Sequence, residues 1–342
     1  MRRLLNTLYI TTQGAYLAQD GETIQVRVEH ETRLQLPIHT LSGLVCFGHV
    51  GMSPQLMHLC AERGVTISFL SEHGRFLARV TGETQGNVLL RREQYRRADN
   101  EESALAIARL IVAGKIANAR SVVQRAAREL DGAAAEPLQP LPERLAGSAE
   151  EALRATSLER LRGIEGDAAR AYFDGFDAMI CGDRDSFRFY ERNRRPPLDP
   201  VNCLLSFVYT LLVHDYRSAL ETTGLDPAAG YLHTDRPGRP SLALDLMEEL
   251  RAALADRFVL TLINRRQVAG PGFRTSESGA VLMDDATRKE VLVAWQKRKQ
   301  EEIVHPFLDE KIPIGLIPLA QAQLLARHLR GDLDAYPPFF WK

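Results

Sequence analysis

Three short segments carry side chains whose chemistry suits a divalent cation. Glu165 lies between two glycines, which allow a ligand to approach the backbone closely. His233 ends a short apolar run just before a turn, where an imidazole can be held rigidly with one face open. Asp245 and Glu248 lie three residues apart in a segment with helical apolar spacing, so they share a helix face, as do Asp245 and Glu249. Two acids on one turn repel each other unless a cation or an arginine lies between them.

A carboxylate, an imidazole and a second carboxylate together predict a site for Mg²⁺ or Mn²⁺. Glu165, His233 and one acid from Asp245–Glu249 would supply oxygen ligands and one nitrogen, whereas a zinc hydrolase would normally need more histidine. This set fits a phosphodiesterase or a phosphoryl-transfer enzyme. The sequence has no Walker loop, dinucleotide-binding glycine motif, H-E-x-x-H or G-x-S-x-G, so kinases, dehydrogenases, zincins and α/β-hydrolases are not supported.

Each of these three signals alone also has a structural explanation. Glu165 could stabilise the start of a helix through the helix dipole. His233 could be a surface residue with only local hydrogen bonds, and Asp245–Glu249 could be an exposed acidic turn. The sequence pattern leaves these alternatives open.

Two segments could bind the backbone of a nucleic acid. Residues 88–130 contain nine basic and five acidic residues, and residues 184–195 contain five arginines interleaved with aromatic side chains. Basic and aromatic residues together suit phosphates and unstacked bases, and Arg194 and Arg195 are the predicted DNA contacts in the second segment. The alternative is a solvated helix face. Because the whole chain has a net charge of -1, any nucleic-acid site must be local.

The composition predicts a cytoplasmic protein with two domains. The chain has 342 residues, of which 45% are hydrophobic, enough for sizeable cores. Its four cysteines include no C-x-x-C pair, which favours free thiols in a reducing compartment. No secretory signal is recognisable, and the longest apolar runs are shorter than the roughly 18 residues of a membrane span.

The order of the predicted elements indicates an α+β fold, with a small β-rich domain over residues 1–86 and a larger all-α domain over residues 87–342 that carries the metal site. Alternating or continuous apolar residues predict strands at 8–12, 23–28, 44–47, 65–70 and 76–80. Asp20-Gly21 predicts a hairpin turn, and Ser53 predicts the N-cap of a short helix starting at Pro54. Helical spacing predicts helices at 101–130, 149–161, 167–176, 201–214, 242–258, 285–302 and 317–330.

Several motifs occur in a characteristic order along the chain. They are Leu36-Pro37, Gly51-Met52-Ser53, Lys115–Arg120, Arg162–Gly166, Arg194–Asn202, Leu205–Tyr209, Gly230–His233, Ser241–Glu248 and Tyr336–Phe339. In this combination the sequence resembles the CRISPR-associated spacer-acquisition integrase, the first of the Cas proteins, and is most similar to versions from type I-C loci. The resemblance extends over essentially the whole chain.

The resemblance implies that the metal ligands are Glu165, His233 and Glu248, and that Asp245 is a second acid often needed for catalysis. Relatives often have aspartate at the position of Glu248, so glutamate is within the family pattern. Groups that contact DNA or line the site in relatives match three further residues, Tyr209, Arg236 and Arg251.

The resemblance also implies an activity and partners. A protein of this family would be a DNA endonuclease and integrase of CRISPR adaptation that acts on double-stranded and branched DNA. Its β-rich domain would help to form a homodimer. It would work with the small second Cas protein and, in systems similar to type I-C, commonly with a fourth Cas protein that is a nuclease.

Two other functions remain compatible with the same residues. The chain could be a DNA-binding scaffold without catalysis, in which the acids and the histidine are structural. It could also be a structure-selective repair nuclease that uses the same site outside CRISPR adaptation.

Overall fold

The computed structural model describes residues 7–29, 31–41, 43–72, 76–80, 82, 88–130, 132 and 135–341. The chain divides into two compact units. The first unit comprises Met1–Gln85 together with Arg288–Glu302 and Pro313–Leu316, and the second comprises the rest of the chain. The predicted domain boundary between residues 86 and 87 lies outside the described residues and stays a prediction.

The first unit contains two four-stranded sheets. In one sheet, β1 (Thr7–Ile10), β5 (Gly43–Phe47) and β7 (Thr66–Leu70) are parallel, and β8 (Phe76–Val80) is antiparallel to β7. The other sheet has the order β4-β3-β2-β6, where β2 (Tyr16–Asp20), β3 (Thr23–Val28) and β4 (Glu31–Pro37) are antiparallel and β6 (Gly51–Met52) is parallel to β2. The sequence therefore predicted a β-rich unit correctly.

Local sequence signals explain the turns and the helix of this unit. The predicted turn at Asp20-Gly21 joins β2 to β3, with Gly21 at a φ of 57°, a left-handed conformation that glycine adopts without steric cost. Helix α1 (Pro54–Glu62) starts where predicted, because the side chain of Ser53 accepts a hydrogen bond from the Leu56 amide at 3.2 Å. Leu56 on α1 belongs to the apolar core of the sheets.

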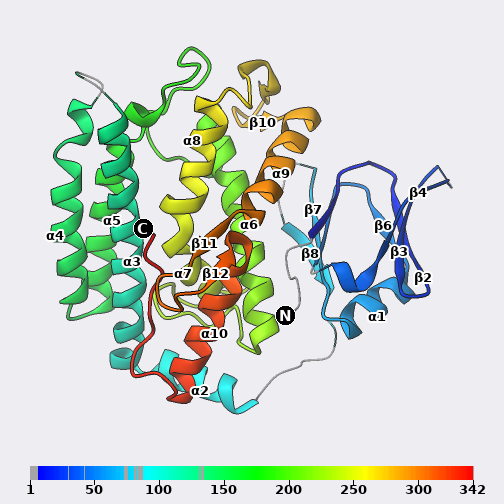
Figure 1. Cartoon of the computed structure of the whole chain (residues 1–342), viewed down its shortest axis with the longest axis horizontal. Helices are drawn as coiled ribbons and strands as arrows, with labels where there is room; N and C mark the ends of the chain where they lie inside the picture. Colours follow the sequence, from blue (N-terminus) through cyan, green and yellow to red (C-terminus); the bar gives the residue numbers. More distant parts are fainter. Residues whose placement is uncertain are drawn as a thin grey trace. The chain divides into compact units, whose positions relative to one another are not determined.

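The second unit is mainly helical, and its long central helix is α3 (Glu101–Glu129). In Figure 1, α3 lies beside α4 (Leu141–Leu153) and α5 (Leu158–Asp174), and it also contacts α7 (Ser241–Leu250). The remaining described helices of this unit are α2 (Val88–Asp99), α6 (Pro200–Thr223), α8 (Arg257–Asn264) and α10 (Ile317–Arg330). This packing brings together helices that are far apart in the sequence.

The predicted α+β class, a β-rich N-terminal region followed by a helical C-terminal region, is confirmed, but the short strands among the helices were not predicted. A two-stranded sheet of β9 (Phe273–Thr275) and β10 (Val281–Met283) interrupts the helices, and β11 (Glu302–Val304) pairs with β12 (Lys311–Pro313) in another. In addition, helix α9 (Asp285–Gln300) belongs largely to the first unit. Strands of three residues are too short to show a period in the sequence.

Two helix predictions near the candidate ligands were also wrong in their boundaries. The helix predicted at 149–161 is broken between α4 and α5, where the hydroxyl of Ser157 caps α5 by accepting from the Arg160 amide at 3.2 Å. The helix predicted at 242–258 is α7 followed by a π-helical segment, Arg251–Asp256, and then α8. Among the described residues, no helix combines the length and the apolar character needed to cross a membrane.

The cap of α1 can be tested by substitution. We expect Ser53→Ala to lower the free energy of unfolding by about 1 kcal/mol, because the Leu56 amide loses its acceptor at the end of the helix. Urea denaturation followed by circular dichroism measures the change. Ser148→Ala is the control, because the Ser148 hydroxyl donates to the Arg144 carbonyl within α4 and caps nothing. Equal stability of the Ser53 variant and the native protein would contradict the assignment.

Candidate functional site

Two of the predicted metal ligands meet at one lysine. The ammonium of Lys115 on α3 forms an ion pair with Glu165 Oε1 on α5 and lies 2.7 Å from Glu248 Oε2 on α7. Their side chains are largely buried, with exposed fractions of 12%, 26% and 7% for Lys115, Glu165 and Glu248. A cation therefore lies between the two carboxylates, as expected for acids brought close together in a poorly solvated place.

Arg251 supplies a second positive charge to Glu248. Its Nη1 lies 2.6 Å and 2.9 Å from the two carboxylate oxygens of Glu248. Burial would raise the pKa of Glu248, but the charges of Arg251 and Lys115 more than offset that effect and hold the pKa well below its usual range. Glu248 is therefore an anion at all physiological pH values.

His233 is oriented by Asp245. The carboxylate Oδ1 of Asp245 lies 2.6 Å from the ring Nδ1 of His233 and accepts its backbone N–H at 2.9 Å. The other oxygen, Oδ2, accepts the backbone N–H groups of Tyr231 and Leu232 at 2.6 Å and 2.9 Å. Because Nδ1 is engaged, the ring nitrogen that remains for a ligand is Nε2, as in metal sites where a carboxylate orients a histidine.

The glycine before this loop is needed for the close approach. A Cβ atom on Gly230 would lie 2.8 Å from Asp245 Oδ2 and 2.9 Å from the backbone carbon of Ser241. Asp245 is fully buried and makes its contacts with the His233 loop, so it acts as a positioning residue in this structure.

The structure does not bring the three predicted ligands close enough together to share one metal ion. Among the described residues, no group of three or more His, Cys, Asp or Glu side chains lies close enough to hold a metal ion. Glu165 and Glu248 share Lys115, and His233 is near enough for its charge to contribute to the low pKa of Glu248. The donor set of two carboxylates and one oriented imidazole fits Mg²⁺ or Mn²⁺, provided that the Lys115 ammonium moves from between the carboxylates.

Glu165 occupies a different local structure from the one predicted. It lies in the interior of α5 rather than near a helix start, and a Cβ atom on Gly163 or Gly166 would meet nothing within 4 Å. No other part of the described chain therefore packs closely against Gly163 or Gly166. They leave the helix surface beside Glu165 open.

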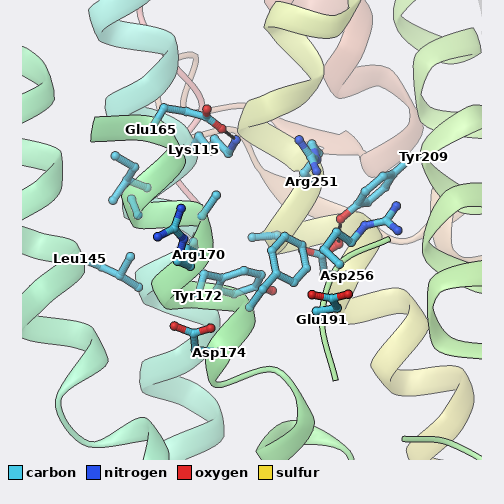
Figure 2. A pocket seen from close by; sticks show the side chains of 18 of the residues that line it. Lys115, Leu145, Glu165, Arg170, Tyr172, Asp174, Glu191, Tyr209, Arg251 and Asp256 are labelled. Carbon is cyan, nitrogen blue, oxygen red and sulfur yellow. Dashed lines mark hydrogen bonds and ion pairs between the residues drawn. The ribbon is translucent and has the colours of Figure 1, made fainter. Parts of the chain in front are cut away.

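A cavity of about 540 Å³ opens beside Glu165 and Lys115 (Figure 2). Both residues line it, and Tyr209, Arg251 and Asp256 line another part of its wall. Its lining includes the basic side chains of Lys115, Arg170, Arg192, Arg194 and Arg251 and the acidic side chains of Glu165, Asp174, Glu191 and Asp256. Such a lining can contact phosphate groups as well as polar groups of a ligand.

Of the predicted DNA contacts, the structure places some at this cavity and others away from it. Tyr209, Arg251 and Arg194 line it, whereas Arg195 and Arg236 are exposed and are not among the lining residues. The hydroxyl of Tyr209 donates to Asp256 Oδ1 at 2.5 Å. The guanidinium carbons of Arg251 and Arg192 lie 4.6 Å and 5.2 Å from the ring centre of Tyr209, in cation–π contact.

Comparison with known proteins identifies the family. A family model described as "CRISPR associated protein Cas1" matches residues 8–297. The chain belongs to the Cas1 family. It is 54% identical over 346 residues to "CRISPR-associated endonuclease Cas1 1" of Chlorobaculum tepidum, with 100% of both chains covered.

Solved structures of Cas1 proteins have the same fold. A Cas1 protein from Thermotoga maritima superposes with a TM-score of 0.83 at 24% identity and covers 98% of this chain and 100% of its own. A chain of a partial Cas6-RT-Cas1–Cas2 complex matches with a TM-score of 0.66 at 25% identity, covering 98% of both chains. The family model and the identity to the Chlorobaculum tepidum protein confirm the Cas1 family that the sequence motifs indicated.

Three residues at or near the ion pair and the cavity were not predicted from the sequence as members of the site. Lys115 was noted only within a basic segment and a family motif, and Arg192 only within an arginine-rich segment, while Asp256 carried no signal. The available signal was a lysine within the otherwise uncharged run of residues 110–119, because an ammonium that is buried with such neighbours requires a partner.

The Asp245 carboxylate gives a test of how the His233 loop is held. We expect Asp245→Asn to lower the free energy of unfolding by about 1–3 kcal/mol. The backbone N–H groups of residues 231–233 donate to the two carboxylate oxygens of Asp245. In the variant an NH₂ group replaces one of these oxygens, so at least one N–H group loses its acceptor. Thermal unfolding at pH 7 measures this change. The exposed Asp235→Asn serves as the matched control, and an Asp245 variant that unfolds at the native temperature would refute the proposed role.

Asp256 predicts a pH dependence of stability. Burial raises its pKa to about 6, although the hydrogen bond from Tyr209 opposes the shift. The native state therefore binds this proton more tightly than the unfolded chain, so the contribution is fully present below about pH 4 and is lost as the pH rises through 6.

Asp256→Asn should remove this pH dependence. In the native protein the raised pKa contributes roughly 3 kcal/mol to the free energy of unfolding at low pH, at about 1.4 kcal/mol per pKa unit. Urea denaturation between pH 4 and pH 7 compares its slope with those of the native protein and of Asp174→Asn, an exposed acid of the same cavity. If the slope of the Asp256 variant matched that of the native protein, the assignment would be wrong.

Proposed function

We propose that this Cas1 family member is a divalent-metal-dependent DNA endonuclease and integrase of CRISPR adaptation. The observation that supports the proposal most directly is the meeting of Glu165 and Glu248, from separate helices, at Lys115. Lys115 and Glu165 also line a cavity that contains several arginines. The identity of 54% to a relative named as a CRISPR-associated endonuclease supports the nuclease activity.

We assign Glu165, His233 and Glu248 as the residues that would hold Mg²⁺ or Mn²⁺. The carboxylates supply hard oxygen ligands, and Asp245 fixes His233 with Nε2 available as a nitrogen ligand. When bound, a divalent ion polarises a phosphodiester and offsets the charge that develops on its oxygens. The two carboxylates balance that positive charge, as they now balance Lys115 and Arg251.

The chain's own residues would act by binding and positioning DNA. Arg192, Arg194 and Arg251 would offset the charge of phosphates in the cavity without reading the base sequence. The attacking group is the 3′-hydroxyl of a protospacer strand, which forms the new bond to phosphorus while a repeat-strand 3′-oxygen leaves. Attack by water at the same phosphate gives nicking. No side chain needs to form a covalent intermediate, so positioning is the main contribution of the protein.

We propose the partners from the family and from the structural relatives. The match to a chain of a complex that contains Cas2 supports a complex with the small second Cas protein. A homodimer, a fourth Cas nuclease and an origin in a type I-C-like system are expected from the family motifs. Double-stranded and branched DNA are the expected substrates.

One observation favours a second candidate, a DNA-binding scaffold without catalysis. Lys115 and Arg251 together already balance the charges of Glu165 and Glu248, so the two carboxylates have a purely structural explanation. A scaffold would bind DNA with or without a divalent cation and would cut none. A repair nuclease outside CRISPR adaptation would cut branched DNA but would not join protospacer ends to a repeat.

Substitution of the ligands distinguishes these functions. We expect Glu165→Gln and His233→Ala each to reduce Mn²⁺-dependent nicking and strand joining by more than the roughly 10- to 100-fold that loss of an outer-shell partner causes. DNA binding, measured by gel shift, should remain within about threefold because the arginines are unchanged. Glu159→Gln, an exposed acid on the same helix as Glu165, is the control.

Chelation provides the second arm of this experiment. Excess EDTA should abolish cutting and joining by the native protein, and added Mn²⁺ should restore both. Full strand joining by either ligand variant, or by the native protein in EDTA, would refute the metal-dependent assignment. Cutting of branched DNA without any joining to repeat DNA would favour the repair nuclease.

A further inference from the structure

The segment that follows α10, residues 332–341, forms no helix or strand and is held instead by buried polar groups. We call it the strap. Its main partner is Glu249 on α7, which is fully buried. Glu249 Oε1 accepts from the Tyr336 hydroxyl at 2.8 Å, and Oε2 accepts from the Phe339 amide at 2.9 Å. Gln321 on α10 also donates to Oε2 at 2.9 Å and to the Tyr336 oxygen at 2.7 Å.

The strap is bound to α3 as well as to α7. Asn118 on α3 donates through Nδ2 to the carbonyls of Glu249 and Phe339 at 2.7 Å and 2.8 Å, and its Oδ1 accepts from the Trp341 amide at 2.7 Å. A Cβ atom on Gly114 would lie 3.0 Å from Pro338 Cβ, so the strap passes directly over this glycine. In Figure 1 the strap is the red segment that runs from α10 back along α3.

These contacts flank the ion pair of the candidate site in the sequence. Gly114 precedes Lys115, and Glu249 follows Glu248. Successive residues of a helix project about 100° apart, so the two helices present Lys115 and Glu248 to the site and present their neighbours to the strap. The strap therefore joins α3 and α7 at the level of the Lys115–Glu248 contact.

We propose that the strap is a brace that sets the spacing of α3 and α7, with Glu249 as a positioning residue for the metal-ligand candidate Glu248. A segment without secondary structure keeps one conformation only through its contacts, and here these are buried hydrogen bonds to both helices. The consequence for metal binding rests on the function proposed above, whereas the bracing of the helices does not.

Three variants of the full-length protein test the brace. Glu249→Leu removes both acceptors at nearly the same volume, and Tyr336→Phe removes one donor and is the milder change. Glu249→Gln is the conservative variant, because an amide keeps one acceptor for the Phe339 amide and can donate to the Tyr336 oxygen. Asp332→Asn is the control within the strap, because Asp332 forms an exposed ion pair with Arg330.

Two measurements are made on each variant, hydrogen exchange without metal and Mn²⁺ binding by electron paramagnetic resonance. In Glu249→Leu we expect amides of residues 332–341 and of α7 to exchange at least tenfold faster, and the Mn²⁺ dissociation constant to rise at least tenfold. Tyr336→Phe should change both quantities in the same direction by a smaller factor. Glu249→Gln and Asp332→Asn should stay within about threefold of the native protein.

The exchange result decides the brace independently of the metal. If strap amides exchange faster in Glu249→Leu while α7 keeps native exchange, the strap does not position α7 and the proposal is overturned. If Glu249→Leu does not fold, the same comparison in Tyr336→Phe decides. If the native protein binds no Mn²⁺ but α7 exchange rises with release of the strap, the metal assignment fails and the brace stands.

Discussion

The contact of one ammonium group with two carboxylates is the constraint on which the site depends. Lys115, Glu165 and Glu248 come from three helices, and each helix must be held at the distance that this contact requires. Two carboxylates that meet in a poorly solvated place would repel each other, and here the ammonium of Lys115 offsets that repulsion. The packing of α3, α5 and α7 therefore determines how closely these charges approach one another.

The π-helical segment after α7 lets one stretch of chain serve both the ion pair and the cavity. Its first residue, Arg251, reaches back to the carboxylate of Glu248, and its last, Asp256, accepts the hydroxyl of Tyr209. Helical turns with i→i+5 hydrogen bonds are rare in proteins, but those that occur are often found at functional sites. The wider turn changes the direction in which the side chains project. Arg251 also stacks on the Tyr209 ring, so the aromatic wall of the cavity and the charge of Glu248 are fixed together.

How much the sequence could predict depended on the range of the interactions. The hairpin at Asp20-Gly21 and the cap at Ser53 follow from a few neighbouring residues, and both were predicted correctly. The acid at 165 was recognised, but its place inside α5 was not, since two glycines resemble a helix break although a helix tolerates each at about 1 kcal/mol. Lys115 could not be assigned to Glu165 and Glu248, because such distant contacts exist only after the helices pack.

The buried acids around the site differ in their hydrogen-bond partners and in their charge. This difference indicates which of them could bind a cation. Asp245 accepts four hydrogen bonds from residues 231–233, so its oxygens are already occupied. Burial raises the pKa of Asp256 to about 6 and that of Glu249 to about 8, which favours the neutral carboxyl of Glu249 at pH 7. Glu248, in contrast, is kept anionic by Arg251 and Lys115. The negative charge available to a cation is therefore concentrated at Glu248 and its ion-pair neighbour, Glu165, and not spread over every acid nearby.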